Sequence, residues 1–244
     1  MNKLIVGFSK DVALPKAEFL LIDDVVVSDG YAQVFDPLKD SFNPLQGLEY
    51  KRARQIADVL YTLYPQGENT LTVRNGKREL LKALMDAGRF DEVKGSEEVE
   101  GMISDILVSP VLKRVLCSGK KKQFSFNPRA VILARIDRAE LGDFDALVLG
   151  LLLMAHYNGQ IVVPDFGFYG RLSHLSLMRE ERLIAGVNYL GELPEKLRQG
   201  ILLIKDKEGR GVLHEDAVVL ARFMSKWTPG QDGYNSFVEK VMKH

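Results

Sequence analysis

The amino-acid sequence predicts an α/β protein with a mainly parallel sheet and helices on both faces. Short, nearly continuous apolar runs, typical of strands buried on both faces, alternate with longer segments whose apolar residues recur at helical spacing. Several of the apolar runs also end in an acidic residue followed by a turn signal. Acids in that position are typical of the carboxyl edge at which open α/β sheets place their chemistry.

The composition is that of an ordinary globular protein. Of the 244 residues, 46% are hydrophobic and 27% are charged, which argues against a disordered chain. Basic and acidic residues number 33 each, so the formal net charge is zero. A positive field over the whole molecule, suited to nucleic acid, is therefore excluded, although a local patch is not.

Cysteine usage and hydropathy indicate a protein of a reducing compartment without a membrane span. The single cysteine, Cys117, excludes an internal disulfide and a multi-cysteine zinc site. The apolar run at residues 144–155 is well short of the roughly 20 residues needed to cross a bilayer. The N-terminal apolar run reaches Lys10 and Asp11 too early for a signal peptide. We expect a cytoplasmic location.

The strands and helices can be assigned in chain order from apolar runs and helical periodicity. Strands are predicted at residues 4–8, 19–22, 25–27, 32–35, 130–136, 160–165, 183–188 and 201–205. Helices are predicted at residues 50–64, 77–87, 102–108, 110–117, 144–157, 192–199, 215–226 and 236–243. Pro65 and Gly88 end the first two helices, and Ser109 caps the helix that Pro110 begins.

Two expectations concern larger segments. The acidic stretch at residues 90–99 is expected to be exposed, and residues 42–45 to form a loop, because Pro44 disfavours helix at Asn43. No repeat, low-complexity tract or linker interrupts the chain. We therefore expect one domain over residues 1–244, with a helical insertion at about residues 76–118.

Five segments together resemble a known family of nucleotide-driven DNA motors. They are AQVFDPLKDSFNPL (32–45), VILARIDRAELGDFDALVLGLLL (131–153), IVVPDF (161–166), LIAGVNYLGELPEKLRQGILL (183–203) and EDAVVLARF (215–223). Their order resembles the HerA/FtsK branch of RecA-like P-loop NTPases, which translocate or package DNA. The resemblance implies a RecA-like fold, ATP and Mg²⁺ as cofactors, and DNA and further copies of the chain as partners.

The phosphate-binding loop of that family has no intact counterpart. The family motif GxxxxGK[ST] cradles phosphates with backbone N–H groups and contacts the γ-phosphate with its lysine. The only candidate is residues 7–12, where Gly7, Ser9 and Lys10 would contact the nucleotide. This segment has one glycine and no GK[ST], and Asp11 would repel phosphate.

The resemblance also assigns candidate roles to three later residues. Asp165 stands at the Walker B position, where it could hold Mg²⁺ or simply cap the following loop and helix. Asn188 could sense the γ-phosphate or bond its own backbone at a strand end. Arg171 is a possible anion contact. Phe166 follows Asp165 where these motors usually carry a glutamate that activates the attacking water, which predicts weak or no hydrolysis.

Three functions remain open at this point. The first is a degenerate HerA/FtsK-like subunit or regulator of a DNA-translocating or packaging assembly. The second is an active ATPase whose phosphate-binding segment is unconventional or comes from another chain. The third is a non-enzymatic virion or mobile-element protein that keeps the fold as a scaffold.

Overall fold

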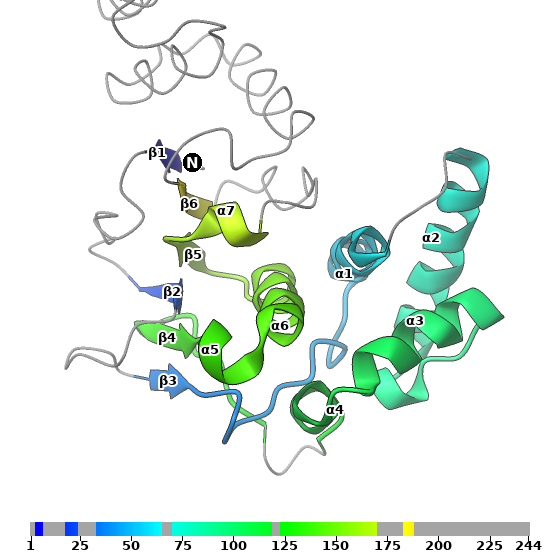
Figure 1. Ribbon diagram of the computed structural model, residues 1–244, viewed down its shortest axis with the longest axis horizontal. Helices are drawn as coiled ribbons and strands as arrows, with labels where there is room; N and C mark the ends of the chain where they lie inside the picture. Colours follow the sequence, from blue (N-terminus) through cyan, green and yellow to red (C-terminus); the bar gives the residue numbers. More distant parts are fainter. Residues whose placement is uncertain are drawn as a thin grey trace, which may run out of the picture. The chain divides into compact units, whose positions relative to one another are not determined.

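The computed structural model describes residues 3–6, 18–23, 33–64, 70–118, 123–169 and 183–187 (Figure 1). The chain divides into two compact units. Unit 1 comprises Met1–Leu14 and Val162–His244, and unit 2 comprises Pro15–Ile161. The expected single domain over the whole chain stays a prediction.

The sheet of unit 2 is parallel, as the sequence predicts. Its strands are β2 (Phe19–Asp23), β4 (Ile132–Arg135) and β3 (Gln33–Phe35), in the order β2-β4-β3. The register pairs Asp23 with Arg135 and Phe35 with Ala134, so the carboxyl ends of the three strands meet at one edge. The first four residues of β2 are all buried, as expected for a strand covered on both faces.

Helix α6 (Asp143–His156) is the buried helix of unit 2. Nearly all its residues from Ala146 to Ala155 are inaccessible to solvent. It lies between the strands and α1 (Tyr50–Leu63), which packs along it (Figure 1). Outside this pair, the chain forms α2 (Thr70–Asp86), η1 (Phe90–Glu92), α3 (Glu97–Leu107) and α4 (Pro110–Leu116). Of these, α2 packs on α1, and α4 contacts both α3 and α6.

Specific contacts fix the short helix that precedes α6 and the C-terminal end of α6. Asp137 caps the short helix α5 (Arg138–Leu141), accepting a hydrogen bond from Ala139 N at 2.9 Å. Gly142 then joins α5 to α6 with a φ of 82°, a conformation that favours glycine. At the other end, Arg52 of α1 donates to the Ala155 carbonyl at 2.9 Å and also bonds the Asn158 side chain. Since the last carbonyls of a helix have no intrahelical partner, this arginine anchors α1 to α6.

The start of α4 follows the sequence prediction. The Ser109 hydroxyl accepts from Leu112 N at 3.2 Å, and Pro110 occupies the first turn. Ser109 also donates to the Asp145 carboxylate. This contact joins the beginnings of α4 and α6.

The predicted loop at residues 42–45 is confirmed, and its side chains are buried. Phe42 is 2% exposed, and its ring lies 5.6 Å from those of Phe35 and His156. Asn43 accepts from Leu45 N at 3.0 Å and donates to the Gly88 carbonyl at 2.7 Å. The loop therefore packs on Phe35 and His156 through aromatic rings, and the Asn43 hydrogen bond joins it to the segment that follows α2.

One expectation for the helical region is wrong, and a second is confirmed only in part. Helix α2 begins at Thr70 rather than at residue 77. Packing against α1 outweighs the weak helix preference of the two threonines in its first turn. Most of the acidic stretch at 90–99 is exposed, as expected, but three apolar residues within it are not. Phe90, Val93 and Val99 are buried at 0%, 3% and 0% exposure, and they anchor η1 and the beginning of α3 to the core.

Unit 1 contains a second set of strands. Strand β1 (Lys3–Val6) pairs in parallel with β6 (Leu183–Val187), and the order in this unit is β1-β6-β5. Strand β5 (Gln160–Val163) contains the division between the two units and leads to α7 (Phe166–Tyr169), which contacts β6. These strands confirm the predictions for residues 4–8, 160–165 and 183–188 to within a few residues at each end.

The remaining predicted elements lie outside the described residues. They are the strands at 25–27 and 201–205 and the helices at 192–199, 215–226 and 236–243. Within the part of the chain that is described, no helix has both the length and the apolar character needed to cross a membrane.

Gly76 lets α2 approach α1 closely, and this contact can be tested. A Cβ at Gly76 would overlap the Tyr61 hydroxyl, which donates to Glu98 at 2.7 Å. Gly76→Ala should therefore lower the free energy of unfolding by about 1–3 kcal/mol through overpacking. Gly101, on α3, has open space around it, so Gly101→Ala should raise stability by about 0.5–1 kcal/mol. Denaturant unfolding of both variants checks the contrast, and a stabilised Gly76→Ala would contradict it.

His156 should make the stability of the fold depend on pH. Burial lowers the pKa of His156 to about 4. A hydrogen bond to the Pro44 carbonyl raises this pKa, whereas the charge of Arg52 lowers it further. Between pH 6.5 and 4 the unfolded chain takes up a proton that the folded chain does not, so stability falls as the pH falls. The loss amounts to about 3 kcal/mol. His156→Gln should flatten this part of the profile, measured by thermal unfolding across the pH range, and parallel profiles would refute the assignment.

Candidate functional site

Asp165 is separated from the end of β5 by one residue, Pro164, and lies at the turn into α7. Its carbonyl accepts from Phe168 N at 3.2 Å, and its side chain is partly exposed. Strand β6 runs close to this turn, because a Cβ at Gly186 would overlap the Pro164 carbonyl oxygen. Glycine at position 186 thus lets β6 lie against the backbone that leads into Asp165.

The residue after Asp165 belongs to the core. Phe166 is 1% exposed, and the next aromatic residues, Phe168 and Tyr169, are also buried, with ring centroids 4.9 Å apart. The short helix α7 therefore contributes packing side chains. No acid that could activate a water molecule occupies the position next to Asp165.

The other predicted site residues lie outside the described residues. These are Gly7, Ser9, Lys10, Arg171 and Asn188. Their assignment to nucleotide contacts, an anion contact and a sensor stays a prediction, as does the metal-binding role of Asp165.

The described part of the chain offers only a partial set of ligands for Mg²⁺. It contains no group of three or more histidine, cysteine, aspartate or glutamate side chains placed to hold a metal ion. Mg²⁺ in nucleotide sites often uses one or two carboxylates and takes its other ligands from phosphates and water. The carboxylate of Asp165 fits the protein's part of such a set.

A second cluster of charged side chains lies in unit 2, at the carboxyl edge of β3 and β4. Asp36 follows β3 directly, and Arg135 is the last residue of β4. The parallel register places Phe35 opposite Ala134, so the residues that follow each of them are neighbours. The sequence predicts acids at this edge, and Asp36 and Asp23 confirm the prediction. It does not predict the arginine between them.

Asp36 is buried and fully engaged. Its carboxylate accepts from Leu38 N at 2.9 Å and pairs with Lys39 Nζ at 2.9 Å and Arg135 at 3.8 Å. Burial alone would raise the pKa of Asp36, but the hydrogen bonds from Lys39 and Leu38 and the charges of Lys39 and Arg135 lower it overall. The carboxylate is therefore ionised near neutral pH and is poorly suited to accept a proton.

Arg135 is surrounded by carboxylates. Besides Asp36, it pairs with Glu140 at 2.7 Å and with Asp137 at 3.6 Å. The hydrogen bond and charge of Glu140, with the charges of Asp36 and Asp137, raise the pKa of the guanidinium despite partial desolvation. The acids at this edge are held in ion pairs, as in a structural network.

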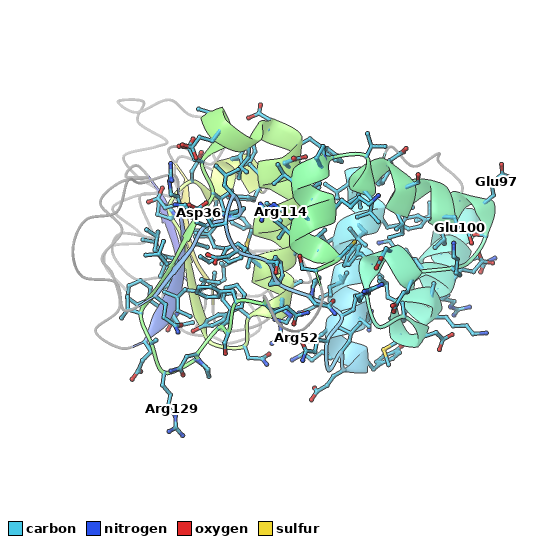
Figure 2. The ribbon with its side chains drawn as sticks, turned by 90° about the horizontal axis from the view of Figure 1, so that it is seen from below. Asp36, Arg52, Glu97, Glu100, Arg114 and Arg129 are labelled. Carbon is cyan, nitrogen blue, oxygen red and sulfur yellow. The ribbon has the colours of Figure 1, made fainter. Side chains whose placement is uncertain are left out.

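Arg114 of α4 holds the turn at residues 36–40 from the other side. Its guanidinium donates to the Asp40 carbonyl at 3.2 Å and also to the Pro37 carbonyl. Asp40 in turn accepts from Asp36 N at 2.8 Å. Figure 2 shows Asp36 and Arg114 next to each other at this edge. The arrangement fixes the end of β3 to α4.

Sequence reasoning misses Arg135 and Arg114, although one of them has a readable signal. If β3 and β4 are expected to pair in parallel, Arg135 at the end of β4 is expected to lie beside Asp36, which follows β3. Arg114 has no comparable signal, because its partners are backbone carbonyls.

Comparison with known proteins assigns no family to the chain. No family model matches it, and no curated protein or solved structure matches it either.

The Asp36 network makes a testable contribution to stability. Asp36→Asn should lower the free energy of unfolding by about 2 kcal/mol at pH 7, because it breaks a buried, charged hydrogen-bond network. Since the pKa of Asp36 is lowered in the fold, its contribution is present above about pH 3.8 and is lost as the pH falls through the folded value.

Urea unfolding at pH 7 and at acidic pH measures both effects. Asp143→Asn is the matched control, because Asp143 is 75% exposed where it pairs with Arg138. Its removal should cost less than about 0.5 kcal/mol. Equal costs for the two variants would contradict the assignment.

Proposed function

We propose that the chain is a RecA-like α/β subunit or regulator of a DNA-translocating or packaging assembly, with weak or no ATP hydrolysis of its own. The HerA/FtsK-like order of segments suggests the kind of assembly. The parallel strands at residues 3–6, 160–163 and 183–187 and the buried α6 are compatible with that order.

The observation that carries the proposal is the burial of Phe166. In the related motors the position after the Walker B aspartate usually carries a glutamate that activates water. Here that position holds a phenylalanine at 1% exposure, inside the core of unit 1. General-base activation next to Asp165 would need a carboxylate within about 3 Å of the attacking water, and this position does not provide one.

The carboxyl edge of β3 and β4 supports the same conclusion. Asp36, Asp137 and Glu140 are paired with Arg135, and Asp36 is also paired with Lys39. An ionised acid with a lowered pKa is a weak base, so this cluster is better suited to holding the strand ends than to catalysis.

The charge distribution supports an association with DNA. Although the whole chain is neutral, α1 and α2 together carry seven basic residues and three acidic ones. Helix α3 carries four acidic residues and no basic one. This separation gives a neutral protein a local basic surface of the kind that phosphates select.

Hydrolysis assays test the proposal. Purified protein with Mg²⁺ and ATP, with and without DNA, should show no turnover above the blank, and Asp165→Asn should leave this result unchanged. The measurement is phosphate release. DNA-stimulated turnover that Asp165→Asn abolishes would overturn the proposal in favour of an active motor.

Restoring the expected acid should not restore catalysis. Phe166→Glu should lower the free energy of unfolding by several kcal/mol, because it places a carboxylate in an apolar, dry position. Phe144→Glu is the matched control, because Phe144 is 43% exposed on the first turn of α6. A stable Phe166→Glu variant that hydrolyses ATP would show that the position faces a working nucleotide site.

A further inference from the structure

An open cavity of about 330 Å³ lies between α1 and α2, and basic residues make up half of its lining. Tyr50, Arg54 and Asp58 line it from α1, and Arg74, Lys77 and Arg78 line it from α2. We call it the α1–α2 groove. It lies within unit 2 and includes no residue of the carboxyl-edge cluster.

Helix periodicity explains why these side chains share the groove. On α1, Tyr50, Arg54 and Asp58 recur every four residues, and on α2 Arg74 and Arg78 do the same. Residues four apart lie on one face of a helix, with their Cβ atoms roughly 5–6 Å apart. The close packing of α1 on α2, made possible by Gly76, brings the two rows together.

Three of the four cations in the groove have no ionic partner in the part of the chain that the structure describes. Lys77 pairs with Asp58 at 3.2 Å, which leaves the charge of neither free. Among the described residues, no ion pair is formed by Arg54, Arg74 or Arg78. The three guanidinium groups therefore present uncompensated charge to whatever enters the groove.

The groove also carries an exposed aromatic ring. Tyr50 is 63% exposed at the start of α1. Unpaired guanidiniums beside an exposed ring are the combination that single-stranded nucleic acid uses, with phosphates on the cations and a base on the ring. A duplex keeps its bases stacked and would leave the tyrosine without a partner.

We propose that the α1–α2 groove binds single-stranded nucleic acid, with Arg54, Arg74 and Arg78 on its phosphates and Tyr50 stacked on a base. A volume of about 330 Å³ suits a group of nucleotide size. The inference rests on the DNA-handling part of the proposed function and identifies the surface that performs it. The competing occupant is the acidic helix α3 of a second copy, which would match the charge of the groove but would not need the ring.

The test is fluorescence anisotropy with a labelled oligothymidylate of about 20 nucleotides, titrated at several salt concentrations. The variant Arg54→Gln/Arg74→Gln/Arg78→Gln should bind at least tenfold more weakly than the wild type. Its plot of log affinity against log salt should be flatter by about 2, because about 0.7 counterion is released per phosphate contact on a single strand.

Two further variants separate charge from stacking. Tyr50→Ala should weaken binding about tenfold without changing the salt slope, because stacking releases no counterions. Arg129→Gln is the matched control and should bind like the wild type. It removes one positive charge from the loop before β4, and Figure 2 shows Arg129 pointing into solvent away from α1 and α2. Thermal melts of all variants confirm that they are folded.

The outcomes that would overturn the inference are distinct from failure of the proposed function. Equal binding by the wild type and the triple variant would remove the groove as the site but would leave DNA handling intact. No oligonucleotide binding by the wild type would remove the groove as a single-strand site and would leave the handling of duplex DNA untouched. Self-association that the triple variant abolishes, without oligonucleotide binding, would assign the groove to α3 of a second copy. None of these three outcomes changes the interpretation of the hydrolysis assay.

Discussion

The architecture of unit 2 depends on the burial of α6. This helix is apolar around nearly its whole circumference, so no face of it can meet water without a large cost. Each fully buried leucine contributes about 1.5–3 kcal/mol relative to an exposed one. The strands cover only one side of α6, and α1 and α4 contact it elsewhere. The apolar composition of α6 therefore requires other helices to cover the sides of α6 that the strands leave open.

Because α1 covers α6, it has two different faces. Its inner face buries Ala53, Ile56 and Leu60 completely. Arg52 reaches back to the end of α6, where it satisfies the Ala155 carbonyl, while Arg54 lies exposed in the groove with α2. Two arginines only two positions apart thus have different roles, one in holding the fold and the other available to an anion.

The sequence predicts well those elements whose signal is long and regular. The helices at α1 and α6 and the strand β4 appear within about two residues of their predicted ends. It fails where contacts between distant segments decide the structure. The first turns of α2 are rich in β-branched residues, which favour helix only weakly, and acidic neighbours hide the apolar spacing of Phe90, Val93 and Val99.

The candidate sites show why an acid at a strand end is an ambiguous signal. Asp36 and Asp165 both follow a strand, and in the sequence both look like residues of an active edge. The difference lies in their neighbours. Arg135 and Arg114, from distant parts of the chain, fix the turn of Asp36 in a closed network, and the sequence does not reveal this pairing. For Asp165 the informative neighbour is adjacent in sequence. Because Phe166 is buried, a general base at this strand end would have to come from another segment or another chain.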